Sequence, residues 1–158
     1  MKGENAMARI PVADELAIRE LMSRYYRALD VGDTEGYLDC YTPDGEAIEE
    51  GDNGIEVRKG REEIRKLVLR FHQRPDFPGH QHLFSNAIFD PDPDAPGERW
   101  IVRTYAWATI NRPPEPPHLH WCGHVRDVVA KVGDEWKIAR KEIMGWTGEV
   151  LSRFERKH

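Results

Sequence analysis

Hydrophobic positions change their spacing along the chain, from three or four residues near the start to two residues beyond His80. Over residues 12–29 the apolar side chains recur at the spacing of one helix face. That stripe consists of Leu16, Ile18, Leu21, Met22, Tyr25 and Leu29. Pro11 and Asp14 suit the beginning of a helix, and Gly32 suits its end. The pattern therefore predicts one long amphipathic helix.

Two shorter helices and a hairpin are predicted before the spacing changes. Residues 33–41 read as a short helix capped by Asp33 or Thr34, which the turn-forming letters TPDG would end. Residues 46–60 contain two short strand-like stretches around an Asp-Asn-Gly turn, which is typical of a hairpin. Residues 60–71 place apolar side chains on one stripe and predict a third helix.

Beyond His80, four segments alternate apolar and polar side chains, with connections rich in Pro and Gly between them. These predicted strands cover residues 82–90, 98–111, 118–132 and 135–146. Their short connections favour an antiparallel meander. Because helices come first and strands afterwards, we expect a single α+β domain in which the helices cover one face of an antiparallel sheet. The domain would span residues 1–158, with its core in about 12–147.

The predicted strands carry bulky side chains on both faces. In residues 98–111 one face would hold Trp100 and Val102, and the other would hold Ile101 and Tyr105. Helices cover only one face of the sheet, so the second face needs another cover. We therefore expect self-association through the sheet, as a dimer or trimer. The interface would include some of Ile101, Arg103, Tyr105, Trp107 and Trp121.

Charge and cysteine content exclude several classes of function. The 158 residues carry a formal net charge of -5, and the densest basic run, RKGREEIRK, is interrupted by acidic residues. Nucleic acids and anionic membranes bind basic surfaces, so neither is an expected partner. Cys40 and Cys122 form no Cys-x-x-Cys pattern, which argues against a disulfide framework and a thiolate metal site. Since we find no apolar leader and no apolar run of membrane length, we expect a cytoplasmic protein.

The stretch HQHLFSN, residues 80–86, combines imidazole and amide groups with apolar side chains. In a regular strand His80, His82, Phe84 and Asn86 would share one face. Such a half-polar face suits neither bulk solvent nor a plain core. The stretch therefore predicts the wall of a pocket.

Asp30 is the second unusual position, because it lies in the last turn of the predicted first helix. A carboxylate is unfavourable there, by up to about 1 kcal/mol, since the helix dipole favours cations at that end. Two interpretations are open. Asp30 could bond to the backbone amides of Gly32 or Asp33, or it could lie at the rim of whatever the helix covers.

Several motifs occur in an order and spacing that resemble a known family. They are YYRALDVGD, YTPDG, KGREEI, HLFSN and GDEWKIARKEI. Together with the order of elements, they resemble the SnoaL-like branch of the nuclear-transport-factor-2-like superfamily over about residues 14–146. The resemblance implies a cone, in which a strongly curved antiparallel sheet wraps a long helix and encloses a pocket. Residues 80–86 would face that pocket.

Within this superfamily the pattern is similar to the dehydratase and dehydrohalogenase group, which includes scytalone dehydratase, bile-acid 7α-dehydratase and hexachlorocyclohexane dehydrochlorinase. The resemblance implies that Asp30, at the helix end, pairs with His82 on the strand after the third helix. Tyr25 matches a tyrosine of the bile-acid enzyme, and Asn86 follows His82 on the same strand. The arginine that the bile-acid enzymes carry near the end of the last strand has no counterpart in EIMGW.

These residue types suit the removal of a proton from carbon. A neutral imidazole takes the proton, a carboxylate fixes its tautomer and stabilises the imidazolium, and a phenol or amide assists the leaving group or oxyanion. We therefore expect a lyase or isomerase, free of any cofactor, that acts on a small, hydrophobic and cyclic molecule. His82 would be the general base and Asp30 its orienting partner. Tyr25 and Asn86 would be the polar assistants.

Other side chains are further candidates for the pocket wall. They are Tyr26, Tyr41, His80, His120 and His124. The pairs HQH and HLH could bind a metal, but no acidic ligand follows at short spacing, so we expect no metal. Two alternatives stay open. One is a non-catalytic ligand-binding or assembly module on the same cone, and the other is the small subunit of a ring-hydroxylating dioxygenase, which would fill its cone and need an iron-bearing partner.

Overall fold

A computed structural model describes residues 9–51, 54–75, 77 and 79–145. The helices in that part of the chain are α1 (Val12–Val31), α2 (Thr34–Asp39) and α3 (Arg61–His72). The strands are β1 (Tyr41–Gly51), β2 (Gly54–Lys59), β3 (His80–Pro91), β4 (Arg99–Ile110), β5 (His118–Val132) and β6 (Glu135–Gly145). The predicted α+β class and the order of elements are confirmed.

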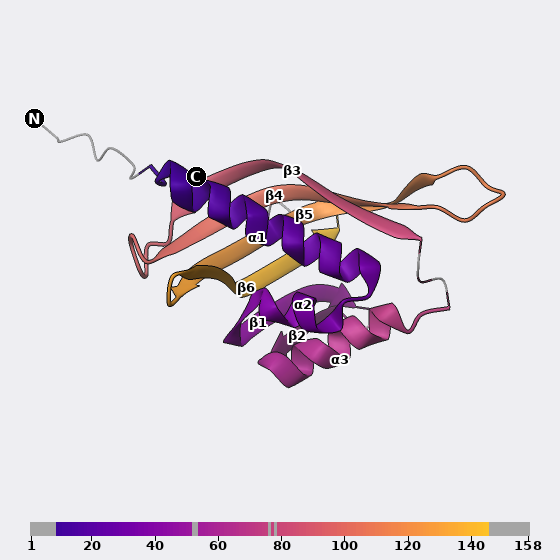
Figure 1. Cartoon of the computed structure of the whole chain (residues 1–158), viewed down its shortest axis with the longest axis horizontal. Coiled ribbons are helices and arrows are strands. Elements are labelled where there is room, and N and C mark those ends of the chain that lie inside the picture. Colours follow the sequence, from indigo (N-terminus) through magenta and orange to yellow (C-terminus); the bar gives the residue numbers. More distant parts are fainter. Residues whose placement is uncertain (1–8, 52–53, 76, 78, 146–158) are drawn as a thin grey trace, which may run out of the picture.

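The strands form one curved, open sheet in the order β2-β1-β6-β5-β4-β3 (Figure 1). Neighbours from β3 to β6 pair antiparallel, as their short connections predict. β1 and β6, however, run parallel, which corrects the expectation of a purely antiparallel sheet. The reason is the segment containing α3, which carries the chain from the β1–β2 hairpin to the opposite edge, so the meander returns to β1 from the far side.

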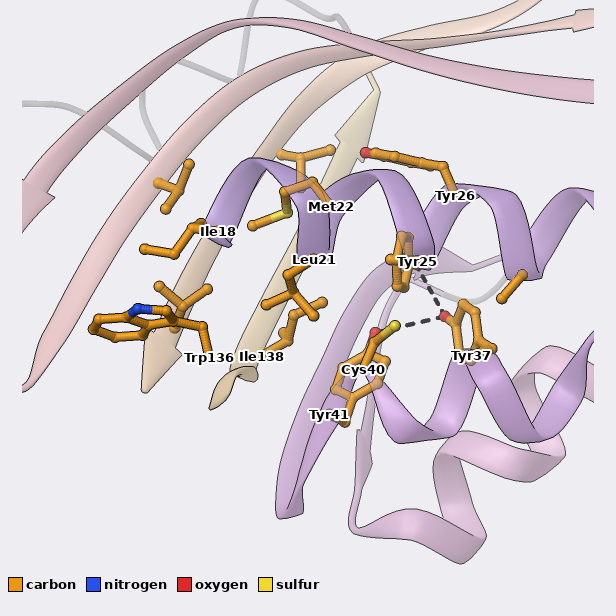
Figure 2. Packing of buried hydrophobic residues seen from close by; sticks show 14 of the residues in the cluster. Ile18, Leu21, Met22, Tyr25, Tyr26, Tyr37, Cys40, Tyr41, Trp136 and Ile138 are labelled. Atoms are coloured by element: carbon orange, nitrogen blue, oxygen red, sulfur yellow. Dashed lines mark hydrogen bonds between the residues drawn. The ribbon is translucent and has the colours of Figure 1, made fainter. Parts of the chain in front are cut away.

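Helix α1 lies across the sheet and buries one face against it (Figure 1). Figure 2 shows Ile18, Leu21 and Met22 of that face in the same cluster as Trp136 and Ile138 of β6. Leu16 was expected on the buried stripe but is 62% exposed. It precedes Ile18 by two residues, which is about 200° of helix rotation, so it points away from the sheet.

Gly32 fixes the end of α1. Its φ of 78° lies in the left-handed region, and its amide donates a hydrogen bond to the Ala28 carbonyl. A Cβ at this position would also lie 3.3 Å from the Phe77 ring. Conformation and space therefore both favour glycine. The helix ends at Val31, immediately before the predicted stop at Gly32, and Asp30 lies in its last turn as predicted.

The segment from α2 to β2 follows the prediction in outline. Asp33 caps α2 by accepting a hydrogen bond from the Gly36 amide at 2.9 Å. The letters TPDG were predicted as a turn but lie inside β1. Strand β6 pairs with β1 at Tyr41 and again from Glu46 onward, and the register is irregular between these two residues. The predicted hairpin is confirmed by antiparallel β1–β2 pairing. Its turn includes residues 52–53, which lie outside the described residues.

The sheet face that turns away from α1 exposes large apolar side chains. Tyr105 is 43% exposed and Ile88 is 59% exposed, and the β3–β4 register places both on that face. Trp121 was expected beside them but belongs to the opposite face. It pairs with Ala108, and both residues line the cavity described below. Self-association through the outer face stays a prediction.

Substitution on the outer face tests this prediction. Tyr105→Glu places a charge in the expected interface and should convert a dimer or trimer into monomers, because a buried unpaired carboxylate is unfavourable. Leu16→Glu is the control, since Leu16 is exposed on α1 and away from the sheet. Light scattering at micromolar protein concentration gives the mass of each variant. A wild-type protein that is a monodisperse monomer would contradict the prediction.

Candidate functional site

Asp30 and His82 meet between the end of α1 and the start of β3. Nδ1 of His82 lies 2.5 Å from Oδ1 of Asp30, and the His82 backbone amide donates to Oδ2 at 2.8 Å. The side chains are 15% and 16% exposed, so the pair is largely shielded from water. The predicted contact is therefore present. The loop amides are used elsewhere, since Gly32 and Asp33 both donate to the Ala28 carbonyl.

The contact assigns the proton positions on the imidazole. An ionised carboxylate only accepts hydrogen bonds, so Nδ1 of a neutral His82 carries the hydrogen that faces Asp30. Nε2 then keeps its lone pair. Because His82 also lines a cavity, the ring combines a fixed orientation with access to a bound molecule.

Aromatic rings hold the His82 imidazole on two sides. The Tyr26 ring is stacked on it, with centroids 6.0 Å apart and an interplanar angle of 16°. The Phe71 ring meets it edge-on at 5.8 Å. Phe84 stacks on Tyr26 from the next position of the same β3 face. These contacts restrict the rotation of the imidazole without using its nitrogen atoms.

His72, which the sequence pattern did not mark, ties the turn containing Asp30 to α3. One ring nitrogen, Nε2, lies 3.0 Å from the Leu29 carbonyl, and Nδ1 lies 3.0 Å from the Thr34 hydroxyl. A carbonyl only accepts, so Nε2 is the donor. The bond fixes the residue that precedes Asp30 along the chain. Only the tertiary fold brings the three residues together, so local spacing could not have identified His72.

A cavity of about 560 Å³ opens beside the Asp30–His82 pair. The predicted residues that line it are Tyr25, Tyr26, His80, His82 and His120. The wall residues that sequence reasoning missed include Tyr37, Glu49, Leu67, Phe71, Trp121 and Val125. Most of the wall is aromatic or aliphatic, with imidazoles from β3 and β5 and a group of carboxyl and guanidinium side chains from β1, β2 and α3. The missed residues come from several elements that converge only in the folded chain.

Asn86 does not reach the cavity. The β3–β4 register shifts between Ser85 and Ile88, and Asn86 has a φ of 55°, in the left-handed region. This irregularity ends the alternation that would have placed Asn86 on the same face as His82. Its side chain is exposed instead. The predicted position of Asn86 as a polar assistant in the pocket is therefore wrong.

Tyr41 and His124 also lie outside the cavity wall. Tyr41 is buried, with its hydroxyl 3.5 Å from that of Tyr37, which does line the cavity. His124 meets the outer-face Tyr105 edge-on at 5.0 Å. Successive residues of a strand face opposite sides, and on β5 it is Val125 that turns toward the cavity.

Tyr25 lines the cavity, but its hydroxyl is bonded to the protein. It lies 3.0 Å from the Tyr37 hydroxyl (Figure 2). Burial raises the pKa of Tyr25 well above its ordinary value and raises the pKa of Tyr37 to about 12. Both phenols are therefore neutral near pH 7. They can exchange hydrogen bonds with a ligand or with each other, but they cannot act as phenolate bases.

Residues 11–142 match the family model of the SnoaL-like domain. The chain belongs to the SnoaL-like family. A comparison with curated proteins gives no match.

Solved structures share the SnoaL-like fold of this chain. An NTF2-like protein with a cystatin-like fold from Novosphingobium aromaticivorans has a TM-score of 0.76 at 22% identity, over 93% of this chain and 91% of that one. A protein of unknown function from Nostoc punctiforme has a TM-score of 0.73 at 25% identity, over 89% and 97%. A candidate scytalone dehydratase from Novosphingobium aromaticivorans has a TM-score of 0.70 at 24% identity, over 86% of each chain. These similarities show the fold.

Imidazoles cluster at one side of the SnoaL-like cavity. The His80 ring lies 6.5 Å from that of His82 and 5.1 Å from that of His120, measured between centroids. Among the described residues, no three His, Cys, Asp or Glu side chains are arranged to hold a metal ion.

In the same part of the chain, no helix is both long enough and apolar enough to cross a membrane.

A buried ion pair lies beside two tyrosines of the SnoaL-like cavity. Nζ of Lys141 lies 2.9 and 3.1 Å from the two carboxyl oxygens of Asp127, and both side chains are fully buried. The ammonium lies 4.2 Å from the centroid of the Tyr25 ring and 5.3 Å from that of Tyr26. Burial raises the pKa of Asp127, and the charge of Lys141 opposes the rise. Sequence reasoning missed the pair, although both residues interrupt apolar strands at positions that face inward.

Removing one partner should destabilise the fold strongly. Lys141→Met leaves the Asp127 carboxylate buried without its cation, and the expected loss is about 3–5 kcal/mol of unfolding free energy. Chemical denaturation followed by circular dichroism measures it. The control is Lys66→Met, whose side chain is 68% exposed and should change stability by less than about 0.5 kcal/mol.

The double variant Lys141→Met/Asp127→Leu completes this test. Replacing both charges with apolar groups removes the uncompensated carboxylate, so the double variant should be more stable than Lys141→Met alone. If Lys141→Met and the wild type unfold at the same denaturant concentration, the ion pair does not contribute to the free energy of unfolding.

Proposed function

We propose that the protein is a cofactor-independent lyase or isomerase of the dehydratase type, which removes a proton from carbon in a small, hydrophobic and cyclic molecule. The observation that carries the proposal is the contact between Asp30 and His82, with the imidazole in the wall of an open cavity. A histidine held only for structural reasons would not need an accessible ring. Family membership is consistent with this activity but does not by itself assign it.

In the proposed step, Nε2 of His82 takes a proton from a carbon of the substrate. In an elimination, the electron pair of that carbon–hydrogen bond forms a double bond as a leaving group departs with its own bonding pair. In an isomerisation, the pair shifts along a conjugated system, and the imidazolium then returns the proton to another carbon of that system. The imidazolium that results lies against the Asp30 carboxylate, which stabilises its charge and has already selected the tautomer. Shielding from water strengthens that attraction.

The cavity wall supports the proposed substrate class. A volume of about 560 Å³ lies within the usual range for small-molecule sites. Rings of Tyr37, Phe71 and Trp121 line it, and aromatic side chains bury planar or cyclic ligands well. An open cavity also counts against the alternative of a dioxygenase small subunit, which would fill its cone.

The proposal places the protein in the cytoplasm. Cys40 is buried, Cys122 is exposed, and both are free thiols in the structure. Two cysteines without a disulfide framework suit a compartment in which glutathione and thioredoxin maintain reducing conditions.

Hydrogen–deuterium exchange of a ketone tests the base without knowledge of the natural substrate. The probe is 2-tetralone, a bicyclic ketone whose benzylic α-protons are acidified by both the carbonyl and the aromatic ring. Its exchange in D₂O is followed by proton NMR, with and without protein. His82→Ala should lower the protein-catalysed rate by about 10²- to 10⁴-fold, because it removes the general base. Asp30→Asn should also slow exchange, since an amide can favour the wrong tautomer.

The matched control is His118→Ala, which removes an exposed imidazole of β5 that does not line the cavity. It should leave the exchange rate unchanged. Melting curves verify that the variants fold. Exchange that survives His82→Ala would remove His82 from the role of base. Binding of the ketone without any catalysed exchange would favour the alternative of a non-catalytic binding module.

A further inference from the structure

The cavity has a second polar region, far from the proposed base along the sheet. Glu49, Glu56 and Arg70 line the wall on the side of β1, β2 and α3. His82 belongs to β3, and the strands β6, β5 and β4 lie between β3 and β1 in the sheet. A ligand in the cavity can therefore contact the imidazoles in one place and this acidic and basic group in another, with apolar side chains of β4, β5 and β6 between them along the sheet.

Glu49 is the member of this group that is held least by charge pairing. Its Oε1 accepts a hydrogen bond from Arg70 at 3.1 Å, but Arg70 also donates to Glu56 at 3.2 Å. Glu56 faces Glu49 across the β1–β2 pair and accepts a further bond from Arg58 at 2.7 Å. One guanidinium is thus shared by two carboxyl groups, and the second guanidinium bonds to Glu56.

The protonation of Glu49 reflects these surroundings. Burial raises its pKa above the ordinary value for a glutamate, Arg70 and Arg58 oppose the rise, and Glu56 adds to it. The charge of Glu49 also contributes to the raised pKa of Tyr37. The group can donate a hydrogen bond as an acid or accept one as a carboxylate.

We propose that Glu49 determines specificity by hydrogen-bonding an oxygen atom at the end of the substrate farthest from His82. The substrate class is then a cyclic molecule with a hydroxyl or carbonyl group at that distal end. This inference rests on the proposed function, which places the reacting carbon of the substrate beside His82. A ligand with an apolar distal end would displace water from Glu49 without replacing its hydrogen bonds, and such a mismatch is strongly disfavoured.

A purely structural role for Glu49 makes a different prediction. If its contact with Arg70 only ties α3 to the hairpin, loss of the carboxyl should lower stability and weaken all ligands equally. If Glu49 binds an oxygen of the ligand, its loss should weaken only those ligands that carry the oxygen. A pair of ligands that differ by one hydroxyl therefore separates the two roles.

The test uses 2-tetralone and 6-hydroxy-2-tetralone, which carries an added hydroxyl on the ring remote from the ketone. Isothermal titration calorimetry gives the dissociation constant of each for the wild type, Glu49→Gln and Glu62→Gln. The wild type should bind the hydroxylated ketone about tenfold or more tightly, as expected for one hydrogen bond to a charged group. Glu49→Gln should lose most of that preference while its affinity for 2-tetralone changes little. Glu62 is exposed on α3 and outside the cavity wall, so Glu62→Gln should behave as wild type.

Several results would overturn the proposal. They are equal wild-type affinities for the two ketones, a preference that survives Glu49→Gln, equal weakening of both ketones, and no binding of either one. Glu49→Ala serves as a second variant if Glu49→Gln unfolds, which melting curves reveal. The readout is binding and needs no turnover. A wild type that binds with the expected preference but catalyses no exchange would therefore refute the proposed activity and leave the role of Glu49 intact.

Discussion

The packing of α1 across the sheet determines where each part of the candidate site lies. Ile18, Leu21 and Met22 anchor the helix in the core, about three turns before its end. The rigid helix then carries Asp30 to β3, where the carboxylate meets both the ring and the backbone amide of His82. Because α1 and α3 do not close over the whole inner face of the sheet, a cavity remains beside this contact. The site is thus a consequence of how one helix is seated.

The cavity that results is polar at its sides and apolar between them. On the β3 side, Tyr26 and Phe71 restrict the His82 ring, and Asp30 assigns its tautomer. On the β1 side, two carboxyl groups share the guanidinium of Arg70. Under the proposed function, such a distribution would orient an elongated ligand, because each end would meet different chemistry while the middle is held by burial alone.

Local patterns predicted the elements and part of the cavity wall, but not the Asp30–His82 contact or the rest of the site. The helix end and the strand after α3 are readable from spacing, and the family resemblance supplied their pairing. Asn86 was misplaced because alternation assumes an uninterrupted strand, although Asn is among the residues that tolerate the left-handed conformation it adopts. Glu49 and His72 were missed because their neighbours come from distant parts of the chain. Parallel pairing of β1 with β6 is likewise a long-range outcome.

The ion pair between Asp127 and Lys141 constrains how the sequence can change over evolutionary time. The two residues pair directly across β5 and β6, and neither side chain is exposed to solvent. Loss of either charge alone leaves the other charge buried without a partner and destabilises the fold. Replacement of both residues by apolar side chains removes that cost. A lineage that loses one must therefore pass through a less stable ancestor or acquire both changes together. On grounds of stability, substitution at one position is thus conditional on the residue at the other.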